Sequence, residues 1–460
     1  MKVGLLACAF HEYWRMFSEE FRSRVIRDIE QAAAGLRRQH LEVVNPCLVD
    51  TLETADAAGR TLAAAGIGML VLVEATYVPD DIPLQALRHL AHVPVAVFST
   101  QEQEDISPAD DYEALMRNGG LTGTTQLTAT FTKMGRAYDV VAGSLAEERP
   151  FQEIARTARV RDVVASLRGL HIGMLGHVFP GMYDLEMDRT RMCGTLGPNV
   201  VSVDLEQFVQ QWREISEDET RTAAEALVAR FRIEGPGEQD LRGSIRVGIA
   251  MERLLECLGL DALCFLGQDY VERAAGAPAR LGGSLMLEKG RLVSCEGDLA
   301  GLVMMHMLYW LAGNPPLQAE WAQYDAAHNA LLLVGHGIGS PAMAGSDDRV
   351  TLTASPEAWG TEGAGVNLQF ILKPGRVTMG SLLETPLGWR MVISSGECLD
   401  YPCLPCREIH ALVRVDRPVK QYVAEIQRRG VSHHVFVAYG DVRAELELLA
   451  STLGIRPYTV

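Results

Sequence analysis

The chain has 460 residues, of which 48% are hydrophobic and 22% are charged, as in ordinary soluble globular proteins. This length exceeds what one hydrophobic core supports, so we expect about two to four domains. The formal net charge of -17 disfavours nucleic acid and anionic membranes as partners, because both attract basic surfaces.

No apolar run reaches the length of a membrane span, and a first strand at Lys2 leaves no room for a signal peptide. The nine cysteines are scattered, and several of them, such as Cys8 and Cys264, lie inside apolar segments. Such cysteines behave as small buried side chains of a reducing compartment and not as a disulfide framework. We therefore expect a cytoplasmic protein.

The first third of the chain alternates short apolar runs with helical segments. The predicted strands lie at 2–9, 41–45, 69–73 and 93–98, with helices at 18–38 and 51–65. This alternation predicts a parallel sheet with right-handed crossovers. The glycine-rich segment 119–123 matches neither the dinucleotide fingerprint nor the Walker pattern, so it predicts a loop and a helix entrance. We place a first α/β domain at residues 1–168.

A second alternating series begins with the apolar run 170–176. It ends in a predicted strand at 291–295 and a predicted buried helix at 299–311, which contains no proline. Gly313, Asn314 and the Pro315-Pro316 pair then end the helix. These features predict a second α/β domain at residues 169–312.

After Pro341 the pattern changes to short β-rich pieces separated by glycine and proline, which predicts an antiparallel barrel or sandwich. The tail returns to helices. The fold class expected is therefore α/β: two consecutive doubly wound parallel α/β domains, followed by a β-rich, barrel-like C-terminal domain at residues 313–460 with terminal helices.

Candidate catalytic or metal-binding residues lie on either side of the apolar run 331–334. Glu296 follows the strand at 291–295, Glu320 lies in an expected loop, and His336 stands between two glycines. Open α/β sheets place their ligands at such strand ends. Each residue also has a structural interpretation, since a glutamate after a strand commonly begins a helix and a lone histidine is usually structural.

A pair of histidines, His433 and His434, follows near the C-terminus. In an extended chain their rings point to opposite faces, so we expect at most one of them to face a given site. Two carboxylates with two imidazoles suit Mn²⁺, Mg²⁺ or Co²⁺ and leave positions open for a chelating substrate. A structural zinc site favours thiolates, and the CxxC at Cys403–Cys406 has no second pair at zinc spacing. Spacing alone does not show that these side chains meet.

Five segments resemble motifs of the L-fucose isomerase and L-arabinose isomerase superfamily, and they follow one another in that family's order. They are Cys295–Asp298, Pro315–Trp321, Leu333–Gly337, Leu372–Met379 and Ser432–Phe436. The resemblance extends over nearly the whole chain, although it is weak outside these motifs. It implies a metal-dependent aldose–ketose isomerase that acts on a free pentose, deoxyhexose or related sugar by proton transfer through an enediol.

Carried over by position, the resemblance implies a Mn²⁺ site, with Mg²⁺ or Co²⁺ as alternatives, formed by Glu296, Glu320, His336 and His434. The two carboxylates would also be the catalytic acid–base pair. Family members form homotrimers or homohexamers whose sites are shared between subunits. The implied substrate contacts are His433 and, from a neighbouring subunit, His11, Tyr13 and Trp14.

Two departures leave the sugar undecided. The segment 119–122 lacks the histidine of the arabinose branch, and Glu320 stands where the fucose branch has aspartate. Two other functions also stay open. One is a non-catalytic sugar-binding or regulatory protein of the same fold, and the other is a metal-dependent sugar epimerase or lyase.

Overall fold

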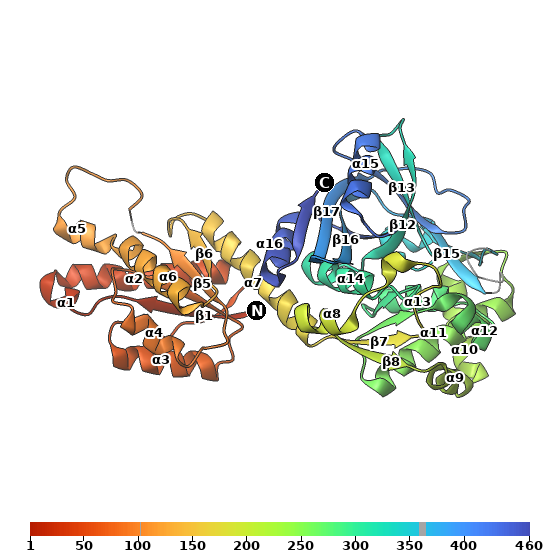
Figure 1. Cartoon of the computed structure of the whole chain (residues 1–460), viewed down its shortest axis with the longest axis horizontal. Coiled ribbons are helices and arrows are strands. Elements are labelled where there is room, and N and C mark those ends of the chain that lie inside the picture. Colours follow the sequence, from red (N-terminus) through yellow and green to blue (C-terminus); the bar gives the residue numbers. More distant parts are fainter. Residues whose placement is uncertain (102, 358–364) are drawn as a thin grey trace. The chain divides into compact units, whose positions relative to one another are not determined.

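The computed structural model describes residues 1–101, 103–357 and 365–460. The chain forms two compact units, Met1–Asp162 and Val163–Val460, coloured red to yellow and yellow to blue in Figure 1. The predicted fold class is confirmed, because two parallel sheets with helices precede a mixed, β-rich sheet. The domain boundaries at 168 and 312 stay predictions.

A parallel sheet forms the centre of the first unit, in the order β2-β1-β4-β5-β6 with β3 also beside β1. The strands are β1 (Lys2–Cys8), β2 (Glu42–Val44), β3 (Leu48–Val49), β4 (Met69–Glu74), β5 (Val95–Ser99) and β6 (Asp139–Ala142). The helices are α1 (Tyr13–Met16), α2 (Glu19–Arg38), α3 (Leu52–Ala64), α4 (Asp81–Leu87), α5 (Tyr112–Arg117), α6 (Gly120–Met134) and α7 (Arg149–Arg168). Because side chains alternate along a strand, Leu5 of β1 packs with α2 and α7, whereas Leu6 packs with α3 and α6. Helices thus cover both faces of this sheet.

The second unit begins with another parallel sheet, in the order β11-β10-β7-β8. Its strands are β7 (His171–Leu175), β8 (Asn199–Val203), β10 (Ala262–Phe265) and β11 (Leu292–Ser294). Helical segments lie between and after these strands: 3₁₀ helix η1 (Tyr183–Leu185), α8 (Arg189–Thr195), α9 (Leu205–Arg213), α10 (Glu217–Arg230), α11 (Glu238–Leu258), π-helix η2 (Gly267–Val271), α12 (Glu272–Ala275), α13 (Arg280–Glu288) and α14 (Leu299–Ala312). The predicted helix at 299–311 is therefore confirmed as α14, and it is buried over most of its length.

The remaining strands form one large mixed sheet. They are β9 (Arg232–Glu234), β12 (Leu317–Asp325), β13 (Ala330–Gly335), β14 (Thr351–Ala354), β15 (Val366–Ile371), β16 (Gly375–Thr385), β17 (Gly388–Cys398), β18 (Ile409–Val415), β19 (His434–Tyr439) and β20 (Arg456–Thr459), with 3₁₀ helices η3 (Pro341–Ala344) and η4 (Asp347–Arg349) and helices α15 (Val419–Arg429) and α16 (Arg443–Leu453). Since β17 pairs with both β16 and β18, the strands β17-β16-β19-β12-β13-β18 close a ring, as a barrel does. The expected antiparallel barrel is present in this ring, because each of its strand pairs is antiparallel. Strand β15, parallel to β18, and strand β20, parallel to β17, lie outside the ring.

The segment after Pro315-Pro316 is a strand and not the expected loop. Glu320 lies within β12, opposite His434 of β19 on one side and opposite Val334 of β13 on the other. The prolines end α14, but they do not prevent a strand from beginning one residue later. Leu317, Gln318 and Ala319 are all buried, so the alternation of a half-exposed strand is missing from this stretch.

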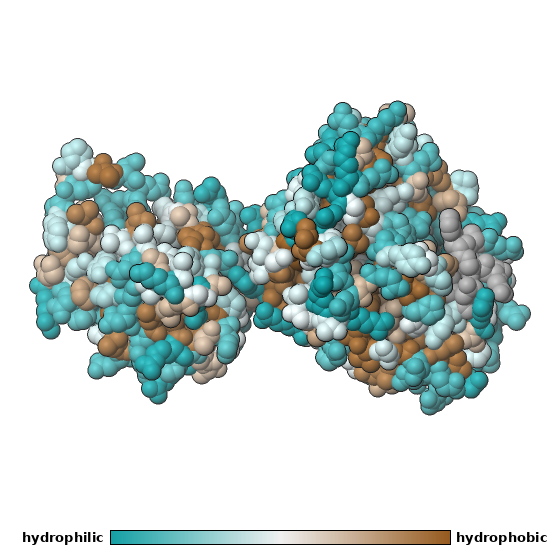
Figure 2. Space-filling model, in the orientation of Figure 1, coloured by the Kyte–Doolittle hydropathy of each residue, from teal (hydrophilic) through white to brown (hydrophobic). Residues whose placement is uncertain are grey.

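Hydrophilic residues prevail on the face shown in Figure 2, and hydrophobic residues are scattered between them. Among the helices within the described ranges, none has both the length and the hydropathy that crossing a bilayer requires.

Candidate metal centre

The backbone at the end of β11 turns sharply to place Glu296. Both Glu296 (φ 61°) and Gly297 (φ 76°) adopt the left-handed conformation, which is uncommon for a residue with a side chain. A Cβ atom on Gly297 would lie 2.6 Å from the carbonyl oxygen of His177, so only glycine fits there. The carbonyl of Glu296 accepts a 3.0 Å hydrogen bond from the backbone N–H of Phe179. This strained turn is held by its neighbours and buries the Glu296 side chain to 1% exposure.

Glu320 and His336 approach the same point from the paired strands β12 and β13. His336 follows the last residue of β13, and its Nε2 lies 3.2 Å from Oε1 of Glu320 and 3.8 Å from Oε1 of Glu296. Unlike the other members of the cluster, Glu320 retains substantial exposure, at 29% of its side chain. It is therefore the carboxylate that a molecule arriving from solvent can reach.

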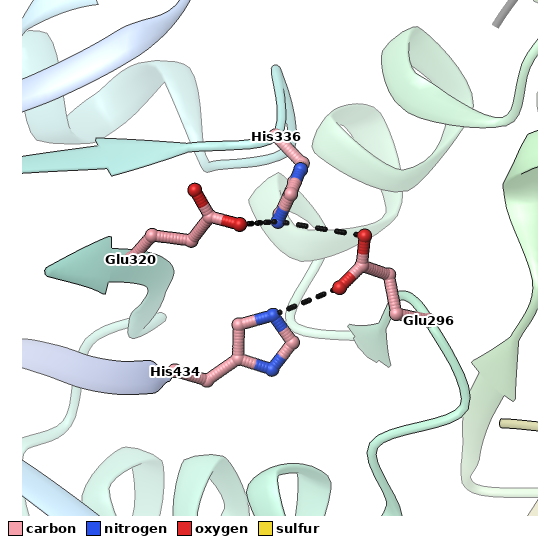
Figure 3. Close-up of side chains that lie close together, drawn as sticks. All are labelled: Glu296, Glu320, His336 and His434. Carbon is pink, nitrogen blue, oxygen red and sulfur yellow. Dashed lines mark ion pairs between the residues drawn. The ribbon is translucent and has the colours of Figure 1, made fainter. Parts of the chain in front are cut away.

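His434, the first residue of β19, completes the cluster. Its Nε2 lies 3.2 Å from Oε2 of Glu296, and its side chain is fully buried. Figure 3 shows the four side chains converging from separate segments of the second unit. One donor atom from each of Glu296, Glu320, His336 and His434 lies within 4.8 Å of the other three.

These dimensions fit a divalent ion. Neighbouring ligands of an octahedral ion with bonds of about 2.1 Å are about 3 Å apart and opposite ones about 4.2 Å apart. Two of the nitrogen–oxygen contacts measure 3.2 Å, close to the neighbouring-ligand spacing. His336 Nε2 is buried and makes no hydrogen bond with any residue of the described ranges, as a ring nitrogen reserved for a metal would be. Two imidazoles with two carboxylates suit Mn²⁺, Co²⁺ or Zn²⁺.

An outer group of polar side chains orients His434. Oδ2 of Asp298 lies 2.8 Å from Nδ1 of His434, and Oδ1 of Asp298 accepts a 2.6 Å hydrogen bond from the N–H of Gly301 at the start of α14. A carboxylate on one ring nitrogen places the proton there and leaves Nε2 as the metal-facing donor. Nε2 of Gln318 lies 3.1 Å from the same Nδ1, so the ring is enclosed on its outer side.

The electrostatics of the cluster favour a bound cation. Burial disfavours the charged form of His434, but its contacts with Asp298 and Glu296 outweigh burial and raise its pKa to about 10. Burial alone would raise the pKa of Glu296, yet the neighbouring imidazoles hold it well below the ordinary value. The contact with His336 likewise lowers the pKa of Glu320. By contrast, burial raises the pKa of the adjacent Cys295 thiol well above its ordinary value, so this sulfur is not a thiolate ligand.

The expectation that at most one of His433 and His434 faces a given site is wrong. Nε2 of His433 lies 3.5 Å from Oε2 of Glu296, and the two ring centroids are 4.2 Å apart. The alternation rule fails because β19 begins only at His434, so the chain is not extended through both residues. Both rings therefore reach Glu296.

The residues expected to reach a substrate from a neighbouring subunit lie in the first unit, after β1. Nδ1 of His11 lies 3.1 Å from the carbonyl of Asp50, and Nε1 of Trp14 donates a 2.9 Å hydrogen bond to the Asp50 carboxylate. Tyr13 is buried and donates from its hydroxyl to Sδ of Met116 at 3.5 Å. These contacts hold the three side chains in place, and their role toward a substrate stays a prediction.

Sequence reasoning missed two polar residues of the outer group. Asp298 appears in the sequence analysis only as the end of the Cys295–Asp298 segment, although an aspartate directly before an apolar helix is typical of a helix cap. Gln318 lies two residues before Glu320, and this spacing would have placed both on one face of a strand if β12 had been recognised.

No family model matches this chain. The sulfoquinovose isomerase of Alkalicoccus urumqiensis is 25% identical over 370 residues, which cover 79% of this chain and 80% of that protein. The sulfoquinovose isomerase of Priestia aryabhattai is 22% identical over 410 residues, or 89% of each chain. The chain is thus a distant homologue of these sugar isomerases, whereas membership of the L-fucose and L-arabinose isomerase superfamily is not shown. A solved arabinose-binding protein of Shewanella sp. ANA-3, 12% identical over 77% of this chain and 81% of its own, aligns with a TM-score of only 0.17, which does not indicate a shared fold.

Proposed function

We propose that this protein is a metal-dependent aldose–ketose isomerase. The observation that carries the proposal is the convergence of Glu296, Glu320, His336 and His434 in the interior of the second unit. The distant homology with sulfoquinovose isomerases over most of both chains supports the same reaction class. A binding protein would have no need for two carboxylates beside an open metal position, so the cluster favours catalysis over simple sugar binding.

The four side chains would hold a divalent ion such as Mn²⁺, which supplies Lewis acidity that polarises a sugar carbonyl and acidifies the adjacent C–H bond. The protein's own part is proton transfer. One carboxylate removes the proton from C2 of the open-chain aldose and returns it to C1, while the second moves the hydroxyl proton from O2 to O1, through an enediol. Atoms and electrons balance without any oxidant.

Glu320 and Glu296 suit different parts of this cycle. Glu320 is partly exposed and can contact the carbon skeleton, whereas Glu296 is enclosed by histidines. We propose Glu320 as the base at carbon and Glu296 as the group that holds the metal and the substrate oxygens. A pair of carboxylates in unlike surroundings is the usual basis for dividing acid and base roles.

Sulfoquinovose is the first candidate substrate, because the homologues are named for it. L-Arabinose and L-fucose follow from the motif resemblance. We expect one sugar of a panel that includes all three to form its ketose in the presence of Mn²⁺, with no reaction after chelation. An epimer or a cleavage product in place of the ketose would indicate the epimerase or lyase alternative.

We also propose a homotrimer or homohexamer in which His11, Tyr13 and Trp14 contact the sugar bound by a neighbouring subunit. The support is that these side chains follow β1 at the carboxyl edge of a parallel sheet, where α/β proteins bind ligands. Analytical ultracentrifugation tests this directly. A monomer that stays active at high dilution would contradict a shared site.

A further inference from the structure

A cavity of about 440 Å³ lies at the amino edge of the parallel sheet of the second unit. Leu170, Ala262 and Leu292 line it. Leu170 directly precedes β7, and the other two are the first residues of β10 and β11. Glu296 follows the carboxyl end of β11, so the candidate metal centre lies at the other edge of this sheet. The cavity is therefore separate from the proposed isomerase site.

The lining combines a buried apolar part with an exposed polar part. Leu170, Ala262 and Leu292 are buried and offer only hydrocarbon contacts. Asp261 and Trp310 also line the cavity, and both are exposed to solvent, Trp310 at 50%. A ligand that fits both parts is therefore amphipathic, with an apolar tail and a polar head.

The polar part of the cavity favours a positively charged head. Asp261 supplies a carboxylate, and no lining residue within the described ranges is a lysine or an arginine. Lys289 adjoins the lining in sequence, but its ammonium group pairs with Glu252 at 2.5 Å. Helices α7 and α14 both end at this cavity, and helix C-termini carry partial negative charge. The net charge of -17 adds a general attraction for cations.

Trp310 offers a second kind of contact to a cation. It lies one turn after His306 on α14, and the two ring centroids are 5.9 Å apart. The face of an indole ring attracts an ammonium group through the negative charge of its π-system. Trp310 therefore presents a cation–π surface in the same cavity as the Asp261 carboxylate.

Ser166 determines which nitrogen of His306 carries the ring proton. The Ser166 hydroxyl donates to the carbonyl of Val163 at 2.8 Å, and Nε2 of His306 lies 2.9 Å from the same hydroxyl oxygen. Because the hydroxyl proton is already used, Nε2 donates to this oxygen and Nδ1 keeps a lone pair. Burial lowers the pKa of His306 to about 4, so its ring is neutral at neutral pH. Nδ1 can therefore accept a hydrogen bond from an N–H group of a ligand.

We propose that this cavity binds a small alkylammonium ion. Asp261, Nδ1 of His306 and the indole face of Trp310 hold its ammonium group. Its alkyl chain lies against Leu170 and Leu292. A neutral hydroxyl head gains neither the ion pair nor the cation–π contact, and a quaternary ammonium has no N–H to donate to Nδ1. This site is independent of the isomerase function and of the metal.

The test titrates n-butylammonium chloride into the full-length protein by isothermal calorimetry, at neutral pH and constant ionic strength. We expect saturable binding to one site, with the same affinity in the presence and absence of Mn²⁺. Tetramethylammonium, which lacks N–H groups, and butan-1-ol, which lacks a charge, should each bind at least about fivefold more weakly, because each loses charge-assisted hydrogen bonds.

Variants of the two exposed side chains test the individual contacts. Asp261→Asn keeps an oxygen for the backbone N–H of His171, which donates to Oδ2 of Asp261 at 2.9 Å, but it removes the charge. It should bind butylammonium at least about fivefold more weakly. Trp310→Leu should weaken binding at least about threefold, whereas Trp310→Phe keeps an aromatic face and should weaken it less. Glu30→Gln, an equal charge change on the exposed face of α2, should bind as the wild type does.

Several results would overturn the proposal: no saturable binding of butylammonium, wild-type affinity in both Asp261→Asn and Trp310→Leu, or equal binding of butan-1-ol. Binding that requires Mn²⁺ would place the ammonium ion at the metal centre and would also overturn it. So would self-association that Trp310→Leu abolishes, without butylammonium binding, because the cavity would then receive a second copy of the chain. None of these results bears on the isomerase function, whose test is ketose formation.

Discussion

Oε2 of Glu296, at the end of β11, lies 3.2 Å from Nε2 of His434, the first residue of β19. This contact joins the parallel sheet of the second unit to its ring of antiparallel strands. Glu296 arrives on a left-handed turn, and His434 arrives on a strand paired with Glu320. The candidate centre therefore depends on both sheets being formed, and metal binding should stabilise their association.

Replacing Glu296 by glutamine should abolish metal binding while keeping the side-chain shape. Glutamine offers a neutral oxygen or an amide group in place of the carboxylate between three imidazoles. We expect Mn²⁺ affinity to fall by more than about 100-fold, because even changes outside the ligand set cost about 10–100-fold. Metal content after dialysis measures the effect. Glu30→Gln, an equal charge change on the exposed face of α2, should retain the metal, and retention by Glu296→Gln as well would contradict the assignment.

Asp298→Asn should weaken metal binding through His434. An amide nitrogen facing Nδ1 would favour the ring proton on Nε2, where the metal must bind, and an affinity loss of about 10–100-fold is expected. Gly301→Ala tests the same contact by sterics, since its Cβ would lie 2.3 Å from Oδ2 of Asp298 and 2.1 Å from the Phe436 ring. Wild-type Mn²⁺ affinity in a folded Asp298→Asn protein would rule out this orienting role.

Removing one partner of the ion pair between Arg280 and Glu408 should destabilise the protein more than removing both. Their side chains are 5% and 13% exposed, and Nη1 of Arg280 donates to Oε1 of Glu408 at 2.8 Å. Arg280→Met alone leaves a buried carboxylate and should cost about 3–5 kcal/mol, whereas Arg280→Met with Glu408→Leu should cost much less. Urea titration of both variants tests this, and equal losses in the two would refute it.

The first unit should lose stability as pH rises because of Glu74. This residue ends β4 with 1% exposure, and both carboxyl oxygens lack hydrogen-bond partners in the part of the chain that the structure describes. Burial, with a smaller contribution from Asp80, raises its pKa to about 9. The folded state therefore keeps the Glu74 proton, whereas the unfolded chain releases it once the pH exceeds the ordinary pKa of a glutamate. The free energy of unfolding consequently falls between about pH 5 and pH 9, by at most about 1.4 kcal/mol per pH unit.

Glu74→Gln removes this ionisation. Its unfolding free energy relative to the wild type should improve steadily from pH 6 to pH 8.5, whatever constant cost the buried amide adds. Urea titrations at several pH values measure the difference. A difference that does not change with pH would show that Glu74 is already ionised in the folded protein.

Much of the fold could be predicted from the sequence, because parallel strands and buried helices leave continuous apolar runs. The strands containing Leu5 and Val71 and the helix α14 all follow from such runs. The strand carrying Glu320 could not, since its buried half contains a glutamine and follows two prolines. Mixed pairings such as β15 with β18 depend on contacts between distant segments, which periodicity does not encode.

The candidate site could also be predicted in part from the sequence. Glu296, Glu320, His336 and His434 were nominated by residue type and by motif resemblance, and the structure brings them within reach of one ion. Asp184 carries no local signal, because its partner His433 lies in a distant segment. The geometry of the His433–His434 pair depended on where β19 begins, and strand ends are the least predictable feature of a sequence.

The proposed sugar isomerisation at the candidate metal centre can be followed by NMR of sulfoquinovose, L-arabinose and L-fucose, each incubated in D₂O with the Mn²⁺-loaded wild-type protein. We predict that at least one sugar forms its ketose with deuterium at the carbon that receives the proton, and that chelation of the metal stops the reaction. Binding of these sugars to the Mn²⁺-loaded protein without any ketose formed would contradict the proposed isomerase function.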